Sequence, residues 1–267
     1  MLRDAVGQAH EPCTGAPRIV SLVPSLTEMV CALGLSEHLV GRTGFCVHPR
    51  QALRQVPKVG GTKNVAMDKV RALAPTHAIV NVDENQRETV AAMREFIPHV
   101  IVTHPLRPAD NIDLFRFFGA MFHRAEQAEA LARRCAEALA RVEAAATRHR
   151  REKVLYLIWK DPWMTVSRDT YISATLAAAG WDTLPVEAAR RYPEVVPGSA
   201  WLGEVERVLM PSEPYRFRSR HVAQIAALLP LGRTPVQLID GTMMSWYGSR
   251  AIGGLHYLER LRTAGGR

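Results

Sequence analysis

The stretch "RIVSLVPSLTEMVCALGL", residues 18–35, predicts a buried strand that leads directly into a helix. Its first third is an almost unbroken run of apolar residues, as in a strand that is covered on both faces. Pro24 ends this strand, and we expect Ser25 to cap the following helix, with Glu28 in its first turn. Gly34 ends the helix. A strand followed at once by a helix is the unit from which parallel sheets are built.

The same alternation of strands and helices continues along the chain in two stretches. In the first stretch we expect further strands at 39–43, 77–83 and 99–103, and helices at 67–74, 85–96 and 111–122. In the second stretch we expect strands at 153–159, 206–210 and 235–240, and helices at 170–180, 219–229 and 248–262. Strands that alternate with helices in this way indicate a mostly parallel sheet in each stretch.

The longest helical pattern lies between these two stretches, from about Phe122 to His149. Apolar side chains such as Leu131 and Val142 recur on one side of it at helical spacing. A helix of this length spans about 40 Å, enough to bridge two domains. We therefore predict an α/β protein of two lobes, each with a mostly parallel sheet flanked by helices, joined by one long bridging helix. The expected divisions are a polar N-terminal tail (1–17), an N-terminal lobe (18–121), the bridging helix (122–150) and a C-terminal lobe (151–267).

Composition excludes several classes of protein. The chain has 267 residues, of which 47% are hydrophobic and 22% are charged, as in ordinary globular domains. The formal net charge is +8, but the arginines are spread along the helices without a dense run, so we expect no nucleic-acid partner. The four cysteines contain no Cys-x-x-Cys pair, which argues against a disulfide framework and a structural zinc site.

The sequence also bears on location. No run approaches the roughly 18 apolar residues that a membrane-spanning helix needs, so we expect no membrane span. The first 17 residues include Asp4 and lack an apolar core, and therefore do not read as a secretory signal or an anchor. We expect a cytoplasmic protein from the sequence as it stands, and a periplasmic one if the true start of the chain lies upstream.

The loops that follow the strands are the expected site, because ligands of open α/β sheets bind at the carboxyl ends of the strands. In the first lobe these loops include Ser25 and residues 45–49, 60–64 and 83–85. In the second lobe they include residues 159–163, 191–193, 211–215 and 245–247. Both sets are rich in aromatic, proline and polar side chains, which predicts a binding cleft between the two lobes.

Adjacent aromatic residues are the most distinctive feature of these loops. Trp246 and Tyr247 stand side by side in "DGTMMSWYGSR", and two neighbouring rings cannot easily be buried in one direction. Trp163 follows Asp-Pro with no apolar period around it, which favours the cleft. Trp159 ends an apolar strand, where a packed position at the sheet edge is the competing interpretation.

Other loop residues carry chemistry that the sequence leaves open. Cys46 and His48 are two apart, and a thiolate with an imidazole suits iron, cobalt or zinc; the alternative is a buried thiol beside a hydrogen-bonded imidazole. The "GGTKN" loop lacks Walker spacing, so its glycines are expected to permit a turn. Asp83 and Glu84 are candidate acid and base groups or a solvated rim. The chain has no nucleophile elbow, zinc-protease helix or dinucleotide fingerprint, so we expect no catalysis.

The segments "RIVSLVPSLTEMVCALGL", "VPKVGGTKN" and "VRALAPTHAIV" resemble the helical-backbone, or class III, substrate-binding proteins that deliver cobalamin, haem and ferric siderophores to ABC importers. The resemblance runs from about residue 18 to about residue 260. The segments "WKDPWMT", "RYPEV", "PSEPYRF" and "SWYGSR" resemble a subgroup described as cobalamin-binding or metal-receptor-like. What this implies is a stiff two-lobe clamp that holds a bulky metal chelate.

The resemblance also implies roles for individual residues. Arg191 and Lys63 are in position for propionate, phosphate or siderophore carboxylate groups. Asp68 matches the acidic residue with which one lobe docks on an importer, but no carboxylate stands at the second position, near Gly198 and Ser199. The remaining residues expected against the ligand are the aromatic Trp159, Trp163, Tyr215, Trp246 and Tyr247, together with Ser25, Asn64 and Glu84.

The expected function is therefore non-catalytic binding of a metal chelate, a corrinoid first and haem or a ferric siderophore next, with no covalent cofactor. One alternative is a chelatase-like or tetrapyrrole-modifying enzyme, in which Cys46 and His48 ligate the metal and Asp83 and Glu84 accept protons. The other is a receptor for a bare metal ion. The expected partners are the chelate and, if the chain serves import, an ABC permease.

Overall fold

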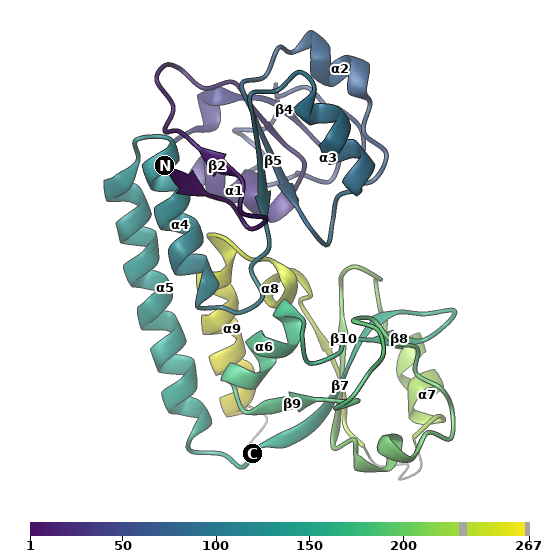
Figure 1. The fold of residues 1–267 in the computed structure, drawn as a ribbon. Coiled ribbons are helices and arrows are strands. Elements are labelled where there is room, and N and C mark those ends of the chain that lie inside the picture. Colours follow the sequence, from purple (N-terminus) through teal and green to yellow (C-terminus); the bar gives the residue numbers. More distant parts are fainter. Residues whose placement is uncertain (230–233, 265–267) are drawn as a thin grey trace. The chain divides into compact units, whose positions relative to one another are not determined.

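The structure is a computed structural model that describes residues 1–229 and 234–264 (Figure 1). The described chain forms two compact units, which share the longest helix. Unit 1 consists of Met1–Pro105, Asp110–Cys135 and Tyr247–Arg250, and unit 2 consists of the remaining described residues. The divisions that we expected at residues 17, 121 and 150 remain a prediction.

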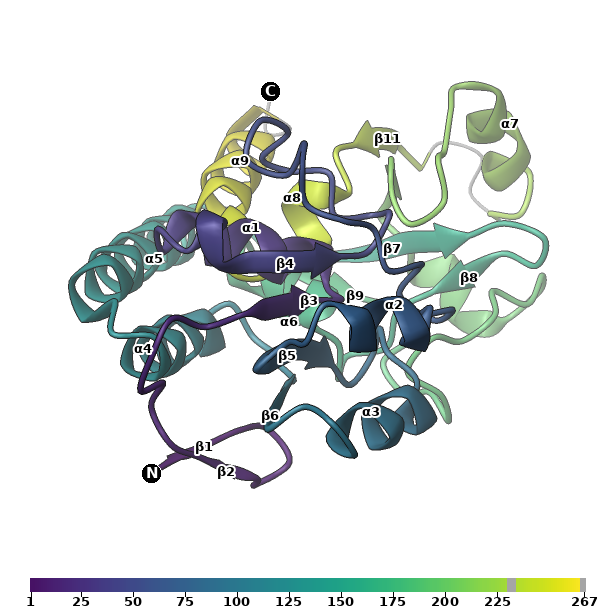
Figure 2. The same ribbon diagram turned by 90° about the horizontal axis from the view of Figure 1, so that it is seen from above.

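A four-stranded parallel sheet forms the centre of unit 1, in the strand order β4-β3-β5-β6 (Figure 2). Its strands are β3 (Ile19–Ser21), β4 (Leu39–Arg42), β5 (His77–Asn81) and β6 (His99–Thr103). The helices of this unit are α1 (Pro24–Ala32), α2 (Met67–Ala72), α3 (Arg87–Arg94) and α4 (Asp110–Met121), with the short 3₁₀ turn η1 (Ser36–His38).

The helix after the deciding strand begins two residues earlier than expected. Pro24 is its first residue, and Val23, in an extended conformation, is the N-cap without a side-chain cap bond. Ser25 therefore does not cap α1 and lies inside its first turn, only 3% exposed. Proline suits this first position because its fixed φ matches the helix and its missing N–H needs no partner there.

The first 17 residues, expected as a polar tail, include a short hairpin of β1 (Leu2–Arg3) and β2 (Ala9–His10). The hairpin is tied to the edge of the sheet at Val102 in β6. The carboxylate of Asp4 accepts a bond of 3.0 Å from the Val102 N–H, and the Ala5 N–H donates to the Val102 carbonyl at 3.0 Å. Two strands of two residues each carry too little pattern to be predicted from sequence.

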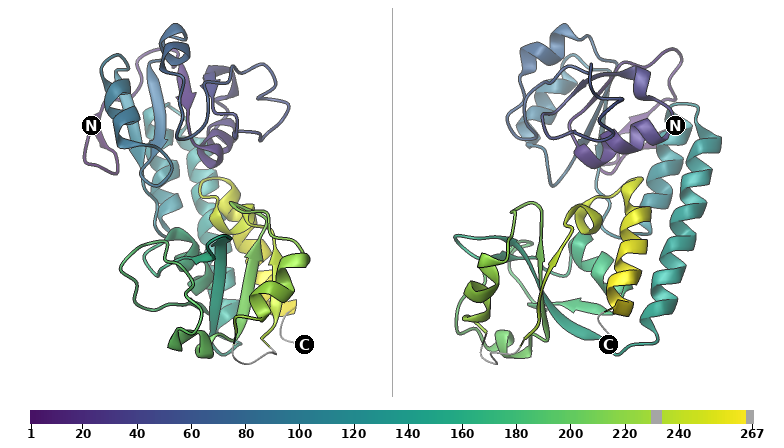
Figure 3. Two further views of the ribbon diagram at one scale, coloured as in Figure 1. Left: turned by 90° about the vertical axis from the view of Figure 1, so that its right-hand side faces the viewer. Right: turned by 180° about the vertical axis from the view of Figure 1, so that it is seen from behind.

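The longest helix is α5 (Ala125–Ala146), slightly shorter than the predicted Phe122–His149. His123, with φ of +54°, separates it from α4. α5 begins in unit 1 and continues into unit 2, with the division between Cys135 and Ala136. Figure 3 shows α4 alongside its first part and α9 alongside its second part. Two ion pairs fix these neighbours, Arg116–Glu129 at 3.0 Å and Arg141–Glu259 at 3.6 Å.

Unit 2 contains a five-stranded sheet in the order β11-β10-β7-β8, with β9 paired to the first half of β7. All pairs are parallel except β7 with β8. The strands are β7 (Glu152–Trp159), β8 (Met164–Thr165), β9 (Trp181–Thr183), β10 (Arg207–Pro211) and β11 (Val236–Ile239). The helices are α6 (Tyr171–Ala178), α7 (Arg220–Ala226), α8 (Thr242–Ser245) and α9 (Arg250–Ala264), with the 3₁₀ turn η2 (Ala200–Glu204).

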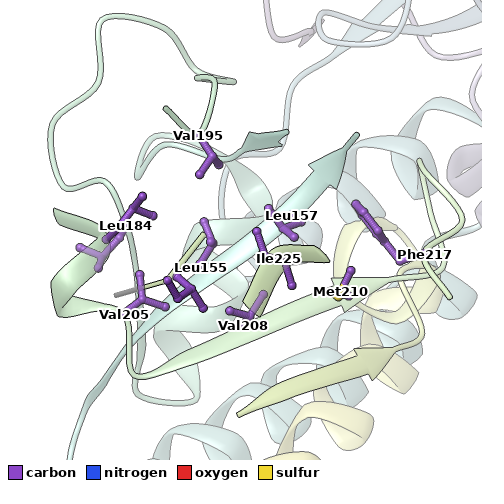
Figure 4. Packing of buried hydrophobic residues seen from close by; sticks show 11 residues of the cluster. Leu155, Leu157, Leu184, Val195, Val205, Val208, Met210, Phe217 and Ile225 are labelled. Atoms are coloured by element: carbon purple, nitrogen blue, oxygen red, sulfur yellow. The ribbon is translucent and has the colours of Figure 1, made fainter. Parts of the chain in front are cut away.

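Each sheet carries its own apolar core. In unit 1, Val20, Ala78 and Val100 pack with Val70 of α2 and Met93 of α3. In unit 2, strands β7 and β10 pack against α7 and the loop before it, as Figure 4 shows with Leu155, Leu157, Met210, Phe217 and Ile225. Two mostly parallel sheets flanked by helices, with one long helix running from one unit into the other, confirm the predicted fold class.

Candidate functional site

The strand ends of unit 1 bring together Glu84 and Tyr247, which are 163 positions apart in sequence. The Tyr247 hydroxyl donates a hydrogen bond of 2.5 Å to Glu84 Oε1. The Tyr247 ring is only 7% exposed, so it contributes to this rim through its hydroxyl group and not through a free aromatic face. Buried Ser25 lies beside the same hydroxyl at the start of α1. Three of the predicted site residues thus meet within unit 1.

Side-chain amides hold the loop that carries Glu84. The Asn81 side chain accepts a bond of 2.8 Å from the Asp83 N–H. The Asn85 side chain accepts from the Asn81 N–H at 2.9 Å and donates to the Thr62 carbonyl at 2.9 Å. Asparagine is favoured at such positions because its side chain can replace main-chain partners in a turn. The loop is therefore fixed both at the end of β5 and to the loop of the two glycines.

Burial raises the pKa of the Glu84 carboxyl to about 7, and the nearby Asp83 carboxylate adds to the increase while the Tyr247 bond opposes it. The same burial, together with Glu84, raises the pKa of the Tyr247 phenol well above its usual value, so Tyr247 stays a hydrogen-bond donor. Near neutral pH Glu84 exists in both protonation states. This rim offers a carboxyl group that donates or accepts a bond according to its partner.

The segment around Tyr247 is anchored to unit 1 at two further points. The Gly248 N–H donates to Asn111 Oδ1 at 2.6 Å, and Arg250 pairs with Glu28 at 2.7 Å. Gly248 has φ of +76°, a conformation that glycine adopts without strain. Its preceding neighbour, Trp246, belongs to unit 2. The adjacent aromatic pair that the sequence singles out is therefore divided between the two units.

An aromatic array lies at the carboxyl ends of β7 and β10 in unit 2. Trp159, 45% exposed, meets Tyr215 edge-on with ring centres 5.4 Å apart. Trp163 stacks on Phe217 at 5.9 Å with 4° between the ring planes. Tyr215 joins the two pairs, because its ring lies 4.8 Å from Phe217 and 5.6 Å from His221. These five residues are the aromatic array.

Polar groups border the aromatic array. The Lys160 ammonium lies 5.6 Å from the centre of the Trp163 ring and pairs with Asp161 at 2.8 Å. The half-buried Trp246 donates its indole N–H to Glu213 Oε2 at 3.2 Å. Trp246 is thus held by the loop after β10, the same loop that carries Tyr215. Trp159, Trp163, Tyr215 and Trp246 therefore all belong to the strand ends of unit 2.

The predicted anion-binding residues have different surroundings. Lys63 and Asn64 are exposed in a turn in which the Gly61 N–H donates to the Asn64 carbonyl at 2.9 Å. Gly60 has φ of +112°, which confirms the expectation that these glycines permit a turn. Arg191 donates to the Asp169 carbonyl at 3.1 Å and lies near the Asp169 carboxylate, so it already has protein partners.

Cys46 is a fully buried thiol. Its Sγ lies 3.0 Å from Thr27 Oγ1 and 3.1 Å from Thr43 Oγ1, both within hydrogen-bond reach. Burial raises the pKa of this thiol despite those bonds, which opposes the thiolate form that metals bind. His48, two residues on, is half-buried. This environment matches the buried-thiol alternative and gives the predicted metal pair no support.

Asp68, the predicted docking residue, is exposed in the first turn of α2. Residues 198 and 199 of unit 2 are Gly198, with φ of +82°, and Ser199, whose hydroxyl donates to the Val196 carbonyl at 2.8 Å. The structure therefore places an accessible carboxylate at the first docking position and none at the second.

Two members of the aromatic array, Phe217 and His221, were not among the sequence-predicted site residues. Phe217 lies two residues after Tyr215, and His221 lies in the first turn of α7, where its Nδ1 accepts from the Arg218 N–H at 3.0 Å. The run "PYRFRSRH" contains one signal that could have indicated Phe217 as a site residue. This second aromatic residue comes two positions after Tyr215, in an irregular segment that follows a strand. Without the tertiary packing, nothing in that run shows which rings meet.

A family model described as "Periplasmic binding protein" matches residues 19–199, about two thirds of the chain. The chain belongs to this family. Membership agrees with the expectation of a non-catalytic binding protein and overturns the chelatase-like alternative. It also confirms the class of substrate-binding protein that the sequence resembles.

Several known binding proteins are similar to this chain in sequence or in fold. A vitamin B12-binding protein of Vibrio parahaemolyticus is 24% identical over 216 residues, which cover 80% of this chain and 73% of that protein. The crystal structure of the periplasmic vitamin B12-binding protein of Vibrio cholerae shares the fold with a TM-score of 0.80 at 16% identity, covering 94% of this chain and 98% of that one. A periplasmic haem-binding protein of Roseiflexus has a TM-score of 0.80 at 21% identity, covering 95% of this binding protein and 100% of that chain.

No helix in residues 1–229 and 234–264 is long and apolar enough to cross a membrane. The same residues contain no group of three or more His, Cys, Asp or Glu side chains placed to hold a metal ion.

Proposed function

We propose that this binding protein holds a bulky metal chelate, a corrinoid before haem or a ferric siderophore, against the aromatic array at the strand ends of unit 2. The observation that carries the proposal is the aromatic array, with Trp159 presenting 45% of its surface to solvent at the carboxyl end of β7. Relatives named as vitamin B12-binding and haem-binding proteins support the ligand class.

The aromatic array suits a large, flat ligand. Aromatic rings contribute wide apolar faces at small conformational cost, and ring pairs gain about 0.5–1.5 kcal/mol beyond the area that they bury. Trp163, Phe217 and Tyr215 support one another by direct ring contact, so the array is ordered before any ligand arrives. A preorganised surface binds with a smaller loss of entropy than a flexible one.

The rim of unit 1 has polar groups of its own that suit such a ligand. Glu84, with its pKa near 7, can accept a bond from a ligand N–H when ionised or donate to a ligand oxygen when neutral. Corrinoids carry amide side chains, which offer both kinds of group. A carboxyl group of adjustable protonation therefore favours an amide-bearing ligand over a purely apolar one.

A chelate fits the described residues better than a bare metal ion. A metal-ion receptor needs three or more converging His, Cys or carboxylate ligands. No such group is present in the part of the chain that the structure describes, and the Cys46 thiol is buried among hydroxyl groups. The metal of the proposed ligand is carried by its own macrocycle or siderophore.

The test is a titration of the purified protein with cyanocobalamin, haemin and a ferric siderophore, followed by absorbance and heat. We expect micromolar or tighter binding of one of the three. Trp159→Ala is expected to weaken that binding about fivefold or more, through loss of a stacking face worth about 1 kcal/mol.

Trp201→Ala is the matched control for this experiment. Trp201 packs on the same core cluster of unit 2, but it lies in η2, before the amino end of β10. We expect its replacement to leave chelate affinity unchanged. Absence of binding to all three chelates contradicts the proposed function, and equal binding by wild type and Trp159→Ala contradicts the site.

The role in import is a separate proposal. Asp68, exposed on α2, is the proposed contact with an ABC permease. Asp68→Asn is expected to leave chelate binding unchanged and to lower uptake by cells that depend on this protein. The compartment remains a prediction; the solved relatives from Vibrio cholerae and Roseiflexus are described as periplasmic.

A further inference from the structure

A cavity of about 590 Å³ lies beside the aromatic array, at the carboxyl ends of β10 and β11 in unit 2. Its lining includes Ser212, Arg216, Phe217, Arg218, Asp240 and Tyr257. Figure 4 shows one part of this wall, with Met210 and Phe217 close together at the end of β10. Phe217 belongs to the cavity lining and also stacks on Trp163, so the cavity and the aromatic array share a side chain.

Two guanidinium groups give the cavity a positive lining. Arg216 and Arg218 flank Phe217 in the loop after β10, and both are exposed. Within the described residues, neither has an ion-pair partner. The next arginine along the chain, Arg220, is different, because it is not among the residues that line the cavity and its Nε lies 3.2 Å from His221 Nε2. Arg216 and Arg218 therefore retain their donor groups for a ligand.

Two hydroxyl groups add donors to the same cavity. Ser212 Oγ accepts a bond of 3.0 Å from the Gly241 N–H, and the Tyr257 hydroxyl oxygen accepts one of 3.0 Å from the Asp240 N–H. An oxygen that accepts a main-chain bond keeps its own hydrogen for donation. The hydroxyl groups thus serve the cavity as donors, like the guanidinium groups.

The only carboxylate in the cavity lining, among the described residues, is already engaged. Asp240 Oδ1 accepts bonds from Thr242 N at 3.0 Å and Thr242 Oγ1 at 2.8 Å. One negative charge against two positive charges leaves the lining with a net positive charge. Close packing also fixes the two loops, because a Cβ on Gly241 would lie 2.6 Å from the Glu213 main chain.

We propose that this cavity is an oxyanion subsite, in which Arg216, Arg218, Ser212 and Tyr257 bind a carboxylate or phosphate group. The guanidinium fork matches the planar carboxylate and the phosphate face, and such charge-assisted bonds are about twice as strong as neutral ones. Because the cavity lies next to the aromatic array, we assign the acid group to a side chain of the bound chelate. That last step, and no other, rests on the proposed function.

The first experiment uses free anions, so that it does not depend on the chelate. Inorganic phosphate and citrate are titrated into the full-length protein at constant ionic strength, with calorimetry and amide chemical shifts as readouts. We expect saturable binding by wild type and at least a tenfold loss for the double variant Arg216→Gln/Arg218→Gln. Arg220→Gln is the matched control, and it is expected to bind both anions like wild type. Thermal unfolding of each variant checks that the fold is retained.

The second experiment identifies the source of the acid group. Haemin and its dimethyl ester differ only in whether the two carboxylates are free. We expect the double variant to lose at least tenfold in affinity for haemin and to bind the ester like wild type. We also expect inorganic phosphate to compete with the chelate and to weaken its binding, because both would occupy the same subsite.

Each outcome bears on one statement. Absence of anion binding by wild type, or equal binding by wild type and the double variant, overturns the subsite while chelate binding by the aromatic array can still stand. Anion binding that needs both arginines, in a protein that binds no chelate, keeps the subsite and assigns it to a free anion. An equal loss in Arg220→Gln shows a general effect of charge and overturns the assignment.

Discussion

Tyr247 donates its hydroxyl hydrogen to Glu84 at 2.5 Å, in a protein where the residue preceding Tyr247 belongs to the other compact unit. The bond joins the loop after β5 to a short segment that returns from unit 2. It places an ionisable carboxyl group and a buried phenol on the rim of unit 1. Because burial raises the Glu84 pKa to about 7, this carboxyl group also makes stability dependent on pH.

Glu84→Gln is expected to stabilise the protein at pH 8 and to have little effect at pH 4.5. The folded pKa, about 7, lies above the unfolded value near 4.5, so the neutral form is favoured by folding. The stability that it contributes is complete below pH 4.5 and is lost as the pH rises to 7. Glutamine stays neutral and its amide oxygen still accepts from Tyr247, so we expect a gain of about 3 kcal/mol at pH 8.

Urea unfolding at pH 4.5 and pH 8 measures this gain. Glu88→Gln is the control, since Glu88 is exposed in the first turn of the nearby α3. Its effect on stability should be small at both pH values. A Glu84→Gln variant that is equally stable relative to wild type at both pH values contradicts the raised pKa.

The histidines beneath the N-terminal hairpin predict the opposite response to acid. His77 is buried and stacks on His99 with ring centres 4.8 Å apart, while His10 Nδ1 lies 3.4 Å from His99 Nδ1. Burial lowers the pKa of His77 to about 4, and the charges of His99 and His10 add to the decrease. The unfolded chain therefore takes up the proton first as the pH falls, and stability is lost between pH 6.5 and 4.

His77→Phe is expected to remove this loss of stability in acid, which we place at about 2 kcal/mol after allowing for solvent screening. Phenylalanine keeps a ring against His99 and cannot take up a proton. His256→Asn is the control, because that imidazole is 38% exposed. Glu84 and His77 change stability in opposite directions over overlapping pH ranges, so each is measured as a difference between wild type and variant. Equal acid sensitivity of wild type and His77→Phe excludes His77 as the cause.

Local pattern was enough to predict the fold class but not the contacts at the site. The run from Arg18 to Leu35 predicts β3 and α1 because a buried strand, a proline and a helix period follow one another in sequence. By contrast, β8 and β9 have only two and three residues. These two strands form because they pair with β7, and such pairing depends on tertiary contacts that the local sequence pattern does not contain.

The same distinction explains the candidate site. Trp159 and Trp163 stand out in sequence because one ends an apolar strand and the other lies in the loop after it, and the structure places both in the aromatic array. Tyr247 also stands out, but its ring is buried and its partner, Glu84, is distant in sequence. No rule based on residue spacing predicts a contact between residues so far apart in sequence. Arg216 and Arg218 gave no signal because exposed arginines occur throughout this basic chain.

Gly60→Ala tests the turn that carries Lys63 and Asn64. A Cβ at Gly60 would lie 2.4 Å from the Asn64 carbonyl oxygen, and the φ of +112° is strained for any other residue. We expect a loss of about 2 kcal/mol or more in the free energy of unfolding. The adjacent Gly61 provides the control, since its Cβ would lie in ordinary contact, 3.4 Å from the Phe45 ring and 4.0 Å from the Asn64 carbonyl oxygen. A Gly61→Ala variant as unstable as Gly60→Ala would show that the turn conformation is not the cause.

Trp159→Ala and Trp163→Ala are expected to separate ligand binding from stability within the aromatic array. Trp163 is partly buried, stacks on Phe217 and packs against the unit 2 core, so its loss is expected to lower the free energy of unfolding by about 2–3 kcal/mol. Trp159 is 45% exposed and makes an edge contact with Tyr215, so its loss should cost about 1 kcal/mol or less. Guanidinium unfolding without ligand measures both values. Equal destabilisation by the two variants would mean that Trp159 serves mainly to pack the core, and would remove the observation on which the proposed chelate site depends.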